Sequence, residues 1–91
     1  MKLSDALFNW LQMEIVSRMR PYDVAAKETL DFFAVILYED HQLREVKALL
    51  SNEESYVITY ELDGQQAQAS FDRQHAEQLW HDIESNPKYN E

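Results

Sequence analysis

The chain is poor in the residues that form loops and cross-links. Its 91 residues include one glycine, two prolines and no cysteine. The absence of cysteine excludes disulfides, thiolate nucleophiles and cysteine-ligated metals. A single glycine excludes the Walker loop and the dinucleotide-binding fingerprint, and no serine lies in a G-x-S-x-G elbow. We therefore predict no catalytic residue, no cofactor and no enzymatic activity.

The three histidines give little support for a metal site. His41 follows Asp40, and His75 lies near the start of the last expected helix. His81 lies four residues after Glu77, so these two side chains would share one helical face. The H-E-x-x-H motif is absent, and no third ligand has a suitable spacing. The sequence predicts no metal site.

Long apolar runs are also absent. The longest spans residues 32–38, far fewer than the roughly 20 residues that a membrane-spanning helix requires. At the N-terminus, Asp5 stands where a secretory signal would have a basic and then an apolar region. We expect a cytoplasmic protein that does not bind a membrane.

Acidic residues dominate the second half of the chain. The formal net charge is −9; residues 1–38 hold four bases and five acids (−1), and residues 39–91 hold four bases and twelve acids (−8). Such a surface repels phosphate backbones, so we expect no nucleic-acid partner. The acids either serve solubility alone or form a docking face, for which the candidates are Glu39, Asp40, Glu45, Glu53, Glu54, Glu61, Asp63 and Glu84.

Two helices are expected before the middle of the chain. Ser4 is a favourable N-cap for a helix over residues 4–20, which Pro21 ends. Asp23 is a second N-cap, for a helix over residues 23–39. The second half of that helix is apolar on nearly every side, which predicts that it is buried. Its main apolar stripe comprises Ala26, Leu30, Phe33, Ala34 and Leu37.

A β-hairpin is the strongest local signal. Asp63-Gly64 is typical of a two-residue type I′ turn. Between strands 56–62 and 65–71 this turn pairs Tyr60 with Ala67, which gathers the apolar side chains on one face. Residues 43–50 fit a helix or a strand; we favour a strand, because Leu50 then pairs with Tyr56, Ala48 with Ile58 and Val46 with Tyr60.

The last helix is expected over residues 72–85 with Asp72 as N-cap, followed by a loose tail over residues 87–91. The sequence thus predicts a single α+β domain over residues 1–91. It is a two-layer domain of order α-α-β-β-β-α, a three-stranded antiparallel meander covered by helices on one face. We expect the second and third helices to cover the sheet, with the first helix added.

From Asp23 to Glu84 the order of elements resembles that of double-stranded-RNA-binding domains, in topology only. Such domains place lysines at the start of their last helix to reach phosphates. Here residues 72–77 hold one base against two acids. The resemblance therefore does not imply RNA binding.

The first helix has more apolar surface than one core contact requires. It is either sandwiched in the core or carries an interface, for which the candidates are Phe8, Trp10, Met13 and Val16. We interpret the chain as a small cytoplasmic protein-interaction or regulatory module without enzymatic activity, homodimeric through this helix in one version, with a protein partner. The alternative is an acidic inhibitor that mimics nucleic acid or docks on a basic protein surface. A third, less favoured hypothesis is a ligand pocket lined by Tyr38, Tyr56, Tyr60 and His41.

Overall fold

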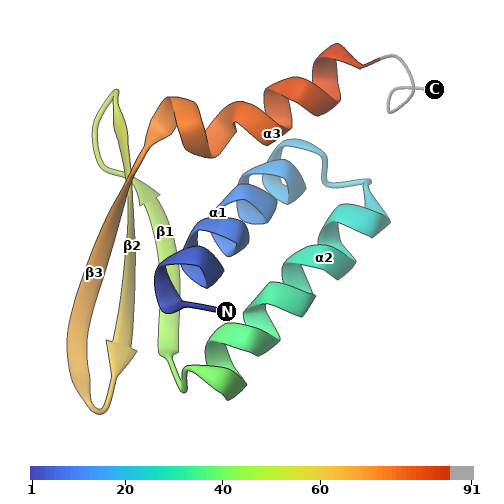
Figure 1. Cartoon of the computed structure of the whole chain (residues 1–91). Helices are drawn as coiled ribbons and strands as arrows, with labels where there is room; N and C mark the ends of the chain where they lie inside the picture. The colour runs from blue at the N-terminus through green and yellow to red at the C-terminus, as the bar shows by residue number, and fades with distance from the viewer. Residues whose placement is uncertain (87–91) are drawn as a thin grey trace.

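A computed structural model describes residues 1–86 of the chain (Figure 1). The expected tail over residues 87–91 lies outside the described residues. No helix within residues 1–86 combines the length and apolar character needed to cross a membrane. The elements in chain order are α1 (Leu3–Met19), α2 (Val24–Val35), the π-helical turn η1 (Ile36–Asp40), β1 (Arg44–Leu50), β2 (Ser55–Leu62), β3 (Gln65–Asp72) and α3 (Arg73–Ser85).

The predicted fold class is confirmed: a three-stranded antiparallel sheet of order β1-β2-β3 carries its helices on one face (Figure 1). The hairpin register is also confirmed, with Tyr60 opposite Ala67 and Tyr56 opposite Phe71. Asp63 and Gly64 both have positive φ, 53° and 79°, as a type I′ turn requires.

The expected strand over residues 43–50 is present, but its pairing is interrupted. Leu50 lies opposite Tyr56 and Ala48 opposite Ile58, as predicted. Between the pairs Arg44–Glu61 and Lys47–Thr59, two residues of β1, Glu45 and Val46, face the single residue Tyr60 of β2, so the expected regular pair of Val46 with Tyr60 is replaced by a β-bulge. Glu45 takes up the extra residue with a φ of 55°. This bulge bends the edge strand at its N-terminal end.

α1 is the central helix of the molecule, which corrects the expected arrangement. It lies against the sheet, with α2 on its far side and α3 across its top (Figure 1). The sheet meets α1 in the core cluster and α3 at β2 and β3, so the third helix contacts the sheet as expected, whereas α2 packs chiefly on α1. The core joins Leu7 and Leu11 of α1 to Ile58 of β2. Because α1 has neighbours on three sides, much of its wide apolar surface is buried, including Trp10, Ile15 and Val16.

The N-caps are only partly as predicted. Asp23 accepts a hydrogen bond from the Ala26 amide at 3.0 Å, and Asp72 accepts one from the His75 amide at 2.9 Å. Ser4 is not a cap, because α1 already begins at Leu3 after Lys2.

The second predicted helix is shorter than expected and is not buried all round. Regular α-helix ends at Val35, and η1 continues to Asp40. Its predicted main stripe does face inward, where Ala26 and Leu37 are buried. Phe32 and Val35 point to solvent, because α2 has a packing neighbour on one side only.

Candidate functional site

The histidines do not come together. His41 Nε2 lies 3.0 Å from the Met1 carbonyl oxygen, and the His75 ring packs on Phe8 with ring centroids 4.6 Å apart. His81 lies beside Glu77, on another part of the molecule. Among residues 1–86, no three histidine, aspartate or glutamate side chains are placed to share a metal ion.

The candidate pocket lined by tyrosines does not form. Tyr56 and Tyr60 are buried on the inner face of the sheet, and Tyr38 is exposed on η1. The His41 side chain contacts the first residue of the chain rather than the tyrosines. These four residues therefore do not line a common cavity.

Glu77 is the most buried acidic side chain of α3 and links that helix to the sheet. Its Oε2 accepts hydrogen bonds from the Tyr56 hydroxyl at 2.6 Å and from Arg73 Nε at 3.1 Å. Its Oε1 lies 3.7 Å from His81 Nε2. A shallow hollow of about 390 Å³ lies beside this network, lined by Glu53, Glu54, Asp72, Arg73, Gln74, Glu77 and His81.

The protonation states explain why this network is structural. Burial, together with the hydrogen bond to Glu77, raises the pKa of Tyr56 to about 12. Burial alone would raise the pKa of Glu77, but the hydrogen bonds from Tyr56 and Arg73 outweigh it and leave that pKa lowered. At neutral pH the phenol is therefore a donor and the carboxylate an acceptor. Neither group is poised near neutrality, where a general acid or base works best.

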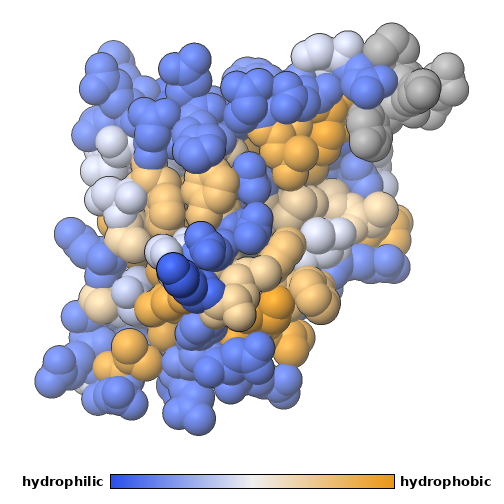
Figure 2. Space-filling view, viewed as in Figure 1, coloured by the Kyte–Doolittle hydropathy of each residue, from blue (hydrophilic) through white to orange (hydrophobic). Residues whose placement is uncertain are grey.

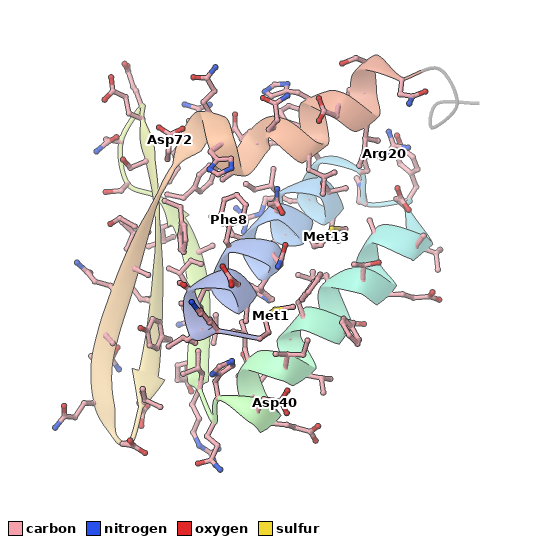
Figure 3. All side chains as sticks on the ribbon, viewed as in Figure 1. Met1, Phe8, Met13, Arg20, Asp40 and Asp72 are labelled. Carbon is pink, nitrogen blue, oxygen red and sulfur yellow. The ribbon has the colours of Figure 1, made fainter. Side chains whose placement is uncertain are left out.

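The four candidate interface residues of α1 do not lie together on one exposed patch. Trp10 and Val16 are buried inside the chain. Phe8 points toward α3 and packs on Phe71 and His75 (Figure 3). Met13 is half-buried. An α1 interface that used Trp10 or Val16 would require these two side chains to leave the interior of the chain.

The eight candidate acids fall into separate groups. Glu39, Glu45, Glu61 and Asp63 line an open groove of about 1000 Å³ between η1, β1 and the hairpin, together with Arg44 and Lys47. Asp40 ends η1 near it, whereas Glu53 and Glu54 lie in the β1–β2 connection. Glu84 forms an ion pair with Arg20 at 2.9 Å. The acids therefore do not build one continuous face.

Within residues 1–86, α2 has more exposed large hydrophobic side chains than any other helix or strand. Val24 is 69% exposed, Phe32 61% and Val35 51%. At positions i, i+8 and i+11 they lie on one side of the helix, opposite the inward stripe. Exposed Tyr22 and Tyr38 flank the two ends. Figure 2 shows hydrophobic surface across the middle and right of the view, over α1 and α2, and hydrophilic surface along α3.

Sequence reasoning missed this face although the signal was present. The inward stripe from Ala26 to Leu37 already satisfies one packing contact, so the remaining apolar residues of the helix were a surplus. For the first helix the sequence allows either core burial or an interface, and for the second it predicts burial. The structure buries much of the first helix and leaves Phe32 and Val35 of the second exposed.

The N-terminal end of α2 is held in place by Arg20, which is buried at the end of α1. Its guanidinium bonds Asp23 at 3.2 Å and Glu84 of α3 at 2.9 Å (Figure 3). It also lies 5.3 Å from the centre of the Tyr22 ring. The Ala26 amide and the Arg20 guanidinium lower the pKa of Asp23, which keeps the cap ionised. The start of the α2 face is thus fixed to both other helices.

Comparison of the chain with protein families, with curated proteins and with solved structures finds no match in any of the three. The α2 face is therefore interpreted from its own geometry and chemistry.

Proposed function

We propose that this protein is a protein-interaction module without enzymatic activity of its own. Its α2 face binds a helical segment of a partner protein, apolar on one side and flanked by lysine or arginine. The observation that carries the proposal is the exposure of three apolar side chains on α2, those of Val24, Phe32 and Val35. The charged side chains of this helix are mostly acidic.

The apolar part of the face favours binding. Phe32 and Val35 are neighbours one turn apart, and Val24 lies two turns before Phe32 with Glu28 between them. Exposed apolar patches on a monomer commonly mark interaction sites. Phe32 supplies an aromatic side chain, a residue type enriched at interface cores. Its ring is braced edge-on by Phe33 at a centroid distance of 5.4 Å, which limits the freedom that binding would remove.

Charge selects the partner. Lys27 is the one base of α2 and η1, against the acids Glu28, Asp31, Glu39 and Asp40. These acids attract a basic segment and repel an acidic one. Electrostatic attraction of this kind raises the association rate of a basic partner. A second copy of a chain with net charge −9 would meet repulsion here. The α2 face therefore fits a basic partner better than it fits itself.

A designed peptide can test this proposal. The probe is a helical peptide of leucine and lysine with leucines at i, i+3, i+4 and i+7; a leucine–glutamate peptide of the same pattern is its control. We expect amide chemical-shift changes on adding the basic peptide to be concentrated in residues 22–40. Phe32→Ala should weaken binding about tenfold, since a central aromatic contact is worth about 1–2 kcal/mol.

Leu49→Ala is the matched control, because Leu49 on β1 is as exposed as Phe32 at 62%. It should leave the affinity unchanged. Equal loss in both variants, or equal binding of the acidic peptide, would count against the α2 face. Shift changes centred on Glu45, Glu61 and Asp63 that vanish at high salt would instead favour an acidic inhibitor that docks on basic surfaces.

A further inference from the structure

The two edges of the sheet differ in how they are protected against pairing with another strand. β1 carries Arg44, Glu45 and Lys47 and has a bulge between Arg44 and Lys47. Charges and bulges are the devices by which proteins keep an edge strand from pairing. β3 is the opposite edge, and its pairing with β2 is regular from Gln65 to Asp72.

β3 has none of these protections along most of its length. Residues 65–71 contain no charge and no proline, in a chain whose net charge is −9. In a two-residue hairpin the residues next to the turn form a hydrogen-bonded pair, and such pairs alternate along the strands. The N–H and C=O groups of Gln66, Gln68 and Ser70 therefore point away from β2. Within residues 1–86 the one strand beside β3 is β2.

The surroundings leave this edge accessible. In Figure 1, β3 forms the outer side of the sheet, and α1, α2 and α3 lie on the side away from its free edge. α3 leaves β3 at Asp72 and runs across α1. A further strand can thus be added at the usual spacing of about 4.8 Å without moving a helix.

We infer that β3 is a self-association edge, on which β3 of a second copy pairs antiparallel to give a continuous six-stranded sheet. The uncharged edge selects this occupant, because two copies of an acidic chain meet least repulsion where the charge is absent. Antiparallel pairing of identical strands also satisfies two-fold symmetry.

The side chains are self-complementary. With Gln68 on the two-fold axis, Gln68 lies opposite Gln68 of the second copy and Gln66 opposite its Ser70. Amide and hydroxyl groups can donate to and accept from one another across such pairs. On the inner face Ala67 lies opposite Ala69 of the second copy, and these small side chains let the two sheets join closely. This interface is separate from the α2 face, so one can exist without the other.

Sedimentation velocity across a wide range of concentration tests the inference. At high concentration we expect the wild-type protein to sediment with twice the 10.8 kDa mass of one chain. The affinity of the dimer should rise with salt, because salt screens the repulsion between the two negatively charged copies. Gln68→Lys places two like charges on the axis and should weaken the dimer about tenfold or more. Leu49→Lys makes a comparable change of charge on the opposite edge and should leave the dimer intact.

Ser70→Lys is the second variant, should Gln68→Lys fail to fold as judged by circular dichroism. Hydrogen exchange gives an independent readout, because the amides of Gln66, Gln68 and Ser70 should become protected as concentration rises. A chain that stays monomeric at millimolar concentration would overturn the inference. So would a dimer that survives both β3 variants, or one that Phe32→Ala abolishes.

Discussion

Trp10→Ala is expected to lower the free energy of unfolding by about 3–5 kcal/mol, the range for large-to-small substitution of a buried aromatic residue. Trp10 is 8% exposed and belongs to the core cluster that joins α1 to the sheet. The lost side chain leaves a cavity between elements that cannot close fully around it. Urea unfolding followed by circular dichroism measures the change.

The control for this prediction is Phe32→Ala on α2. Phe32 is also a large aromatic residue but is 61% exposed, so its loss should cost less than about 1 kcal/mol. The comparison decides which helix is central. If Phe32→Ala unfolded the chain and Trp10→Ala did not, α2 would be the buried helix, as its sequence alone suggested.

The sequence could predict those features that depend on neighbouring residues. The turn at Asp63-Gly64 sets the register of β2 and β3, because both turn residues need positive φ and the side-chain period of a strand is two. Asp23 and Asp72 cap their helices by bonding amides three residues ahead. These interactions are local, so the pattern of residue types contains them.

The position of the helices relative to the sheet is not local and could not be predicted in this way. α1 and the second half of α2 both carry apolar side chains on more than one side, and only one of them can occupy the centre. Trp10 of α1 is 8% exposed and belongs to the core cluster, whereas Phe32 of α2 is 61% exposed. The alternation of Val46, Ala48 and Leu50 predicts the pairing on one side of the bulge, whereas the adjacent charges Arg44 and Glu45 break the alternation where the bulge lies. The proposed binding surface therefore became visible only once the packing of α1 was known.

Tyr56→Phe is expected to lower the free energy of unfolding by about 1.5–3 kcal/mol at neutral pH, the usual value of a hydrogen bond to a charged group. The substitution keeps the buried ring and removes one of the two donors to Glu77 Oε2. The carboxylate then remains largely enclosed with a single donor from Arg73. Tyr60→Phe is the matched control, because Tyr60 is a similarly buried ring on the same strand.

The pH dependence of this difference identifies its cause. The pKa of Glu77 is lowered by folding from its ordinary 4.5, so its contribution is present above that value and is lost as pH falls through the lower folded pKa. The pKa of Tyr56 is raised from 10.0 to about 12, so its contribution is complete below pH 10 and is lost as pH rises toward 12. The stability gap between wild type and Tyr56→Phe should therefore be widest between these two ranges and narrow at both extremes. A gap that stayed constant with pH, or one matched by Tyr60→Phe, would show that Tyr56 stabilises the fold through its ring and not through its bond to Glu77.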